Sequence, residues 1–259
     1  MSEAVSYFLS FLAAAIPAGM PLLYGTLGEI LTEKGGNLNL GVEGMMYMGA
    51  IFGFVGGYYA GSVLLMLLLA FAGGALGALI YAVLTVTLKA NQNVTGLTLT
   101  IFGTGLANFI GENIVLNSPS QTAKVSDELM ARITNAGIPL LKEIPVLGPM
   151  LFDTNIFVYL GIVIAVAMGL YLNHTRVGLN LRAIGENPAA ADAAGVNVTL
   201  YKYAHILVGG GVCGLGGAYV AFITCSGMWI QDCVGGLGWI AVALVIFASW
   251  SPYRALLGS

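Results

Sequence analysis

Long apolar runs separated by short polar stretches occupy almost the whole chain. Each run approaches or exceeds the roughly 20 residues that an α-helix needs to cross a bilayer. We predict seven membrane spans, over residues 5–30, 39–60, 62–88, 96–116, 154–173, 201–225 and 234–250. The polar stretch from about 117 to 153 is much longer than the others. The pattern predicts an all-α fold, a polytopic transmembrane helix bundle in one domain over residues 1–259.

Composition supports a membrane protein that is tightly packed. Of the 259 residues, 58% are hydrophobic and 8% are charged, whereas about 25% are charged in an average soluble domain. Many of the 37 glycines recur four residues apart inside the apolar runs, a spacing that lets helix backbones approach closely in lipid. Pro17 and Pro21 predict a break in the first span, and glycine-rich stretches predict one in the second. The chain stops as another apolar stretch begins, so we expect further spans in a complete protein.

Positive residues in short loops predict the orientation, because they resist translocation. If the seven spans alternate strictly, six of the nine basic residues share one side, which is then cytoplasmic: Lys34, Lys89, Arg176, Arg182, Lys202 and Arg254. The stretch 117–153 and the N-terminus then lie on the extracytoplasmic side. The scattered basic residues form no stripe that would bind nucleic acid.

No sequence motif supports an enzyme. The chain lacks GxxxxGK[ST], HExxH and GxSxG motifs, and its two histidines lie at the ends of different spans. We therefore predict no catalytic residue, no bound cofactor and no metal site in this chain. The three cysteines are read as apolar packing residues, with a Cys225–Cys233 bridge left open as an alternative.

The segment Glu33–Met46, EKGGNLNLGVEGMM, carries polar side chains directly into the membrane. An acid at the centre of a span costs about 2.5–3.5 kcal/mol, so Glu43 needs a cavity or a partner. Either Glu43, Asn37 and Asn39 line a cytoplasmic gate, or Glu43 pairs near the interface. The same choice applies to Asn108 and Glu112 at the outer end of the fourth span, where interfacial placement is favoured.

Three aromatic residues leave a similar choice open. Phe102, Phe109 and Trp229 either pack against neighbouring helices or stack on a solute.

The segment 178–198 predicts a short cytoplasmic helix. Asn187 suits the N-cap, Pro188 the first helical position and Gly195 the position just past the end. The two turns between them are rich in alanine and carry Asp192. Such a short helix is marginal alone in water, so it either docks on a partner or serves as a quiet connector.

Three segments resemble permeases of ABC importers of the branched-chain amino acid, ribose and simple-sugar group. RAIGENPAAADAAGV, residues 182–196, resembles the run that forms the coupling helix of that group. EKGGNLNLGVEGMM resembles its ER-G-x-x-NLG-x-EG-x-M segment, with Lys34 in place of arginine. Residues 235–257 resemble its GxGFIAIALVIFGxWNPLRALLG run, with Trp239, Ser249 and Ser251 as departures. Residues 227–232, GMWIQD, are most similar to nucleoside importer permeases.

The resemblance implies the function and the partners. It implies a permease subunit of an ATP-driven importer in a prokaryotic cell membrane, forming half of the pathway for a neutral polar solute, a nucleoside or else a simple sugar. A second permease subunit, an extracytoplasmic binding lipoprotein and an ATP-binding subunit holding ATP and Mg would complete the importer. A stand-alone secondary transporter or channel is the less favoured alternative. The implied coupling residues are Arg182, Gly185, Glu186, Asn187, Pro188, Ala191, Asp192 and Gly195.

Overall fold

The computed structural model describes residues 3–137 and 154–259, and every regular element in these residues is helical. The helices of the first half are α1 (Glu3–Lys34), α2 (Val42–Ala60), α3 (Val63–Ala82), the π-helical η1 (Val83–Thr87), α4 (Gln92–Leu116) and α5 (Asp127–Thr134). The second half contains α6 (Ile156–His174), α7 (Arg176–Glu186), α8 (Pro188–Ala193), α9 (Val198–Tyr219), the π-helical η3 (Val220–Thr224), α10 (Leu237–Phe247) and α11 (Pro252–Gly258).

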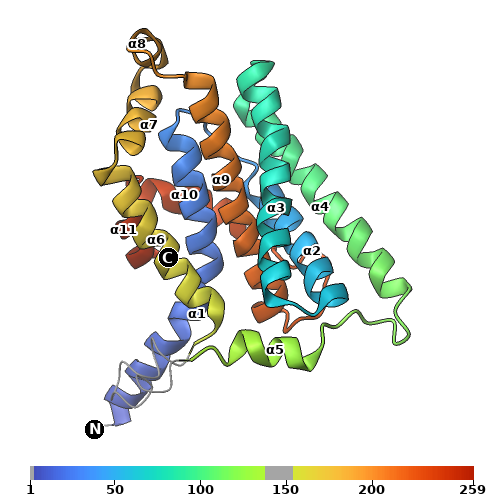
Figure 1. The fold of residues 1–259 in the computed structure, drawn as a ribbon. Coiled ribbons are helices and arrows are strands. Elements are labelled where there is room, and N and C mark those ends of the chain that lie inside the picture. Colours follow the sequence, from blue (N-terminus) through green and yellow to red (C-terminus); the bar gives the residue numbers. More distant parts are fainter. Residues whose placement is uncertain (1–2, 138–153) are drawn as a thin grey trace.

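The predicted all-α polytopic bundle is confirmed. Within the residues that the structure describes, five helical stretches are long and apolar enough to cross a membrane: Ala14–Lys34, Val63–Thr87, Gln92–Leu116, Ile156–His174 and Val198–Thr224. A sixth predicted span corresponds to the 19-residue α2. Figure 1 shows α5 lying across one end of the bundle and α8 at the other. We call these the α5 end and the α8 end.

The seventh predicted span is wrong, because residues 234–250 contain only the 11-residue α10. At a rise of 1.5 Å per residue such a helix is about 16 Å long, roughly half the thickness of the hydrocarbon core. The chain then reverses at Ser249 and Trp250, which both have positive φ, 50° and 54°. Figure 1 shows α10 inside the outline of the bundle.

The predicted break in the first span is also wrong, because α1 continues through Pro17 and Pro21. Proline at position 21 has no N–H for the carbonyl of residue 17. The Tyr219 hydroxyl on α9 donates to that carbonyl at 2.6 Å, so the freed acceptor is satisfied by a neighbouring helix. The glycine-rich second span is likewise one uninterrupted helix, α2.

Backbone-to-backbone contacts join the helices at the centre of the bundle. A Cβ on Gly49 of α2 would lie 2.1 Å from the Cα of Gly214 on α9, and a Cβ on Gly74 of α3 would lie 2.1 Å from the Gly210 carbonyl oxygen. The glycine spacing therefore works as predicted: it brings α2, α3 and α9 into direct contact.

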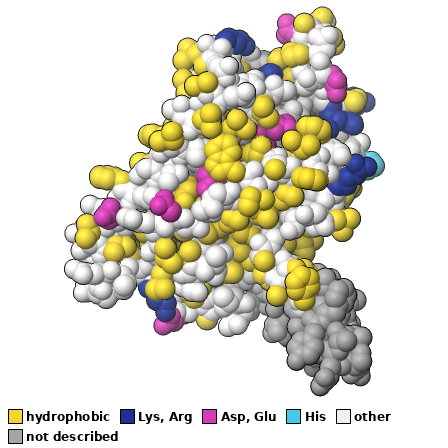
Figure 2. Space-filling view, turned by 180° about the vertical axis from the view of Figure 1, so that it is seen from behind, with side chains coloured by type: hydrophobic (Ala, Val, Ile, Leu, Met, Phe, Trp, Pro, Cys, Tyr) yellow, Lys and Arg dark blue, Asp and Glu magenta, His cyan; other side chains and the backbone are white. Residues whose placement is uncertain are grey.

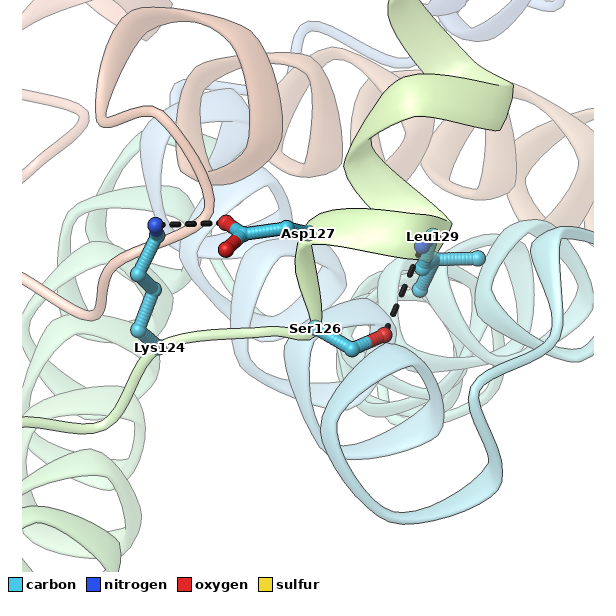
Figure 3. A network of polar contacts seen from close by, with 4 residues as sticks. All are labelled: Lys124, Ser126, Asp127 and Leu129. Atoms are coloured by element: carbon cyan, nitrogen blue, oxygen red, sulfur yellow. Dashed lines mark hydrogen bonds and ion pairs between the residues drawn. The ribbon is translucent and has the colours of Figure 1, made fainter.

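The amphipathic helix α5 was not predicted from the sequence. The Ser126 hydroxyl accepts from the Leu129 N–H at 3.4 Å and caps the helix, and Lys124 pairs with Asp127 at 2.6 Å (Figure 3). Leu129 and Ile133, four residues apart, are buried. The signal was present in the sequence as a serine cap, two acids in the first turn and Arg132 in the last.

The loops beside α5 are joined to one another. Val125 donates its N–H to the Gly227 carbonyl, and Trp229 donates its own to Ala123. Cys213, Cys225 and Cys233 are free thiols, so the bridge left open is not formed. A hydrogen bond with Cys225, together with burial, raises the pKa of the Cys233 thiol.

Candidate functional site

The segment between α1 and α2 carries polar side chains into the interior, as predicted. Asn37 and Asn39 are only 2% and 1% exposed. The Asn39 side-chain oxygen accepts from the Gly41 N–H at 2.9 Å, which closes a turn directly before α2. The Tyr81 hydroxyl on α3 donates to the Leu38 carbonyl at 2.6 Å. The extended backbone of this segment is therefore held by side chains from the surrounding helices.

Glu29 is a further buried acid that sequence analysis missed. It lies on α1 with no exposed surface, and one carboxylate oxygen accepts from the Asn39 N–H at 2.8 Å. Its other oxygen and the Asn37 side-chain oxygen have no hydrogen-bond partner in the described residues. The signal was an acid within a predicted span, which marks a functional position by default.

Glu43 caps the short helix α10. Its two carboxylate oxygens accept from the backbone N–H groups of Gly236 at 2.7 Å and Gly238 at 2.6 Å. The first N–H groups of a helix have no partner within it, and a carboxylate there also complements the helix dipole. Glu43 is 5% exposed. Its partner is thus the backbone of the half-length helix, within the bundle rather than at an interface.

Asn108 and Trp229 lie apart from this buried segment, toward the α5 end. Asn108 exchanges two hydrogen bonds with Asp232: its amide donates to the carboxylate at 2.9 Å and its oxygen accepts from the backbone N–H at 3.3 Å. Trp229 is buried against Phe54, with ring centroids 5.4 Å apart. It therefore packs inside the bundle.

The remaining three outer side chains, those of Phe102, Phe109 and Glu112, lie on exposed positions of α4. The structure therefore does not bring the outer candidates together with Asn37, Asn39 and Glu43 in one cavity.

The short helix predicted after residue 186 is present as α8. The Asn187 side-chain oxygen accepts from the Ala190 N–H at 3.1 Å, and Pro188 occupies the first turn. Gly195 has a φ of +83°, a left-handed conformation that glycine adopts without strain. Ala191 is the one buried residue in α8. Most of this helix therefore faces away from the rest of the chain, beside exposed Glu186 and Asp192.

Helix α7 connects α8 to the buried polar segment. It packs through Leu181 and Ile184, which are buried. A Cβ on Gly185 would lie 2.4 Å from the Lys34 carbonyl oxygen and 3.4 Å from the Gly36 nitrogen, so α7 sits directly on the end of α1 and the turn that follows it. Asn187 alone separates α7 from α8. A displacement of α8 thus has a short route to residues 35–43.

A bundle of spanning helices with a polar segment inside it and an exposed capped helix at one end defines a membrane transport subunit. The family described as branched-chain amino acid transport system / permease component matches residues 11–259, and the chain belongs to that family. No solved structure matches this chain.

Curated relatives include ABC transporter permeases. The putative glucose permease TsgC13 of Haloferax volcanii is 36% identical over 98% of this chain and 75% of its own length. The nucleoside permease NupC of Lactococcus lactis is 35% identical over 92% of this chain and 75% of its own length. The guanosine permease NupQ of Bacillus subtilis is 32% identical over 96% of this chain and 79% of its own length. The chain is accordingly a multi-pass membrane protein and a permease subunit of an ABC importer.

Proposed function

We propose that this permease forms half of an ATP-driven import pathway for a neutral polar solute, a nucleoside or else a simple sugar. The names of the relatives, which include nucleoside, guanosine and glucose permeases, support this solute class. The buried segment of residues 35–43 also suits it. This segment offers amide side chains and backbone groups, and its acid Glu43 is already engaged by α10.

The α8 end is the docking surface for the ATP-binding subunit in this proposal, and therefore faces the cytoplasm. The observation that carries it is a capped helix with almost no burial against its own chain. Such a helix is marginal alone and gains stability by docking. Arg182, Gly185 and Glu186 on α7, with the residues of α8 and Gly195, form the contact region. ATP and Mg belong to the ATP-binding subunit.

Movement of α8 changes access to the pathway through α7. Because Gly185 touches the end of α1, a shift of α7 moves the segment that contains Asn37 and Asn39. During this movement Glu43 either holds or releases the N-terminal end of α10, the half-length helix that lies between the two sides of the membrane. This is how residues 35–43 serve as a cytoplasmic gate.

The α5 end faces the extracytoplasmic side and meets the solute-binding lipoprotein. A second permease subunit completes the pathway. Residues 138–153 of the predicted outer stretch 117–153 lie outside the described residues.

Uptake by cells that carry the complete operon tests the proposal. Radiolabelled adenosine and ribose would be supplied with and without this gene, and with an ATPase-dead partner subunit. Loss of nucleoside uptake in both the deletion and the ATPase-dead strain is expected. Uptake of ribose alone would select the sugar alternative, and uptake that survives the dead ATPase would contradict the proposal.

Glu43 provides a second test of the gate. Glu43→Ala removes the acceptor for the Gly236 and Gly238 N–H groups, and each lost hydrogen bond to a charged group costs about 1.5–3 kcal/mol. We expect Glu43→Ala to abolish uptake, and Glu43→Gln, which keeps one acceptor oxygen, to retain part of it. Equal uptake by wild type and Glu43→Ala would contradict a role for Glu43 in the gate.

A further inference from the structure

A basic cavity opens at the α8 end, beside the coupling region. It has a volume of about 250 Å³ and lies where the ends of α1 and α6 meet α7 and the turn before α11. Three cationic side chains line it: Lys34, Arg182 and Arg254. No acidic side chain is among its lining residues.

These cations have no ion-pair partner among the residues that the structure describes. The ion pairs of residues 3–137 and 154–259 are Lys124–Asp127 and Arg132–Glu128, both on or beside α5. The Arg182 Nε atom is buried and lacks a hydrogen-bond partner there. A buried donor left unpaired costs free energy, so an arginine held in this way needs an acceptor that the described chain does not supply.

Two acids lie near the cavity, Glu33 and Glu186, but neither lines it. Glu33 accepts from the indole N–H of Trp250, a residue in the wall of the cavity. Glu186, at the end of α7, is exposed and forms no ion pair with Lys34 in the described structure.

Figure 2 shows Lys and Arg side chains gathered on the flank of the molecule that carries α7, beside a broad hydrophobic surface. Acidic side chains also lie on this flank, but in the described residues no ion pair joins them to Lys34, Arg182 or Arg254.

We propose that this cavity binds a phosphate-bearing anion, and that the anion is the headgroup of an acidic phospholipid. The place of the cavity favours the lipid: it adjoins the ends of two spanning helices, where headgroups lie. Its wall combines Leu172 and Pro252 with Trp250, and tryptophan is enriched at membrane interfaces. Basic pockets between spanning helices on the cytoplasmic side bind anionic headgroups.

A competing explanation is that the cations only complement the negative ends of helix dipoles. Lys34 ends α1, and cations near helix C-termini are stabilising. That explanation requires no ligand, so it predicts no dependence on anionic lipid.

The full chain, purified in its complex, would be reconstituted into nanodiscs of phosphatidylcholine with increasing fractions of phosphatidylglycerol. The lipids that remain bound after detergent extraction would be quantified by mass spectrometry. We expect phosphatidylglycerol to be enriched over its bulk fraction, and the enrichment to fall about fivefold for each cation removed in Arg254→Gln and in Arg182→Gln/Arg254→Gln. Arg254→Lys, which keeps the charge, should retain it.

The control is Lys89→Gln/Lys202→Gln, which removes two cations from the same end but outside the cavity. It should leave the enrichment unchanged. Inorganic phosphate added to pure phosphatidylcholine nanodiscs forms the second arm, with melting temperature as the readout. If phosphate raises the melting temperature and Arg254→Gln abolishes this effect, the cavity binds an anion, but the anion is soluble phosphate rather than a lipid headgroup. No enrichment and no phosphate effect, or equal loss in the control, would overturn the proposal.

Discussion

Helices α5 and α8 are both short, both capped by a polar side chain and placed at opposite ends of the bundle (Figure 1). They differ in what they pack against. Helix α5 buries Leu129 and Ile133 against its own chain and carries two ion pairs on or beside it. Helix α8 buries only Ala191.

The difference separates a helix that closes the structure from one that is exposed at its surface. Amphipathic spacing gives α5 a face that the bundle covers. The alanine-rich α8 has no comparable face, so its cap and its terminal glycine fix its local shape while its surface stays free. Substitutions at matched positions of the two helices therefore test whether α5 serves stability and α8 serves coupling.

The largest effect is expected from an acid placed in the buried face of α5. Ile133→Asp buries an unpaired carboxylate and should destabilise the protein by about 3 kcal/mol or more. Ala189→Asp on exposed α8 should leave stability unchanged. Thermal unfolding in detergent, followed by size-exclusion chromatography, measures both. Equal melting temperatures for the two variants would show that α5 is not docked as described.

Next in size is a bulky side chain on the exposed face of α8. Ala189→Trp should leave the melting temperature unchanged but obstruct the ATP-binding subunit. A clash of about 1.4 kcal/mol already lowers affinity about tenfold. Ala131→Trp, at an exposed position of α5, is the matched control and should transport normally. Uptake and the amount of ATP-binding subunit that co-purifies would be compared, and normal values for Ala189→Trp would contradict the docking role.

Removing the two caps should give opposite outcomes. Asn187→Ala and Ser126→Ala each delete one acceptor for a helix N–H, at a typical cost of about 1 kcal/mol. The loss at Ser126 should lower the melting temperature and spare uptake. The loss at Asn187 should fray α8, reduce uptake and leave the melting temperature unchanged. If the two variants change melting temperature and uptake in the same way, the proposed difference in role between α5 and α8 is contradicted.

The smallest effect is expected from Lys124→Gln, which breaks the ion pair with Asp127. The two side chains are 49% and 87% exposed, and exposed pairs contribute at most about 1 kcal/mol. Melting temperature at low and high salt should barely distinguish the variant from wild type. A loss comparable to that of Ile133→Asp would mean that the ion pair, rather than the apolar face, holds α5 in place.

Sequence predicted well whatever depends on residues close together in the chain. The bounds of α8 follow from Asn187, Pro188 and Gly195, which act within a few residues of one another. The entry of Asn39 and Glu43 into the membrane follows from the lack of any polar stretch long enough to keep them out.

Sequence predicted poorly whatever depends on distant partners. Glu43 binds backbone groups 193 and 195 residues away. The Pro17 carbonyl accepts a hydrogen bond from the hydroxyl of Tyr219, 202 residues away. Hydropathy merged α10 with the turn after it, because Ser249 and Trp250 bend the chain without changing its apolar character. Nothing local to these residues reveals such pairings.

The contact between Gly49 and Gly214 has a consequence for how this chain can diverge in sequence. In most helix interfaces a larger residue on one side is tolerated once a smaller one appears opposite. Here the residue on each side is already glycine, and backbone meets backbone. No substitution of Gly214 can make room for a larger residue at position 49, so an enlarged side chain at either position requires the two helices to move apart.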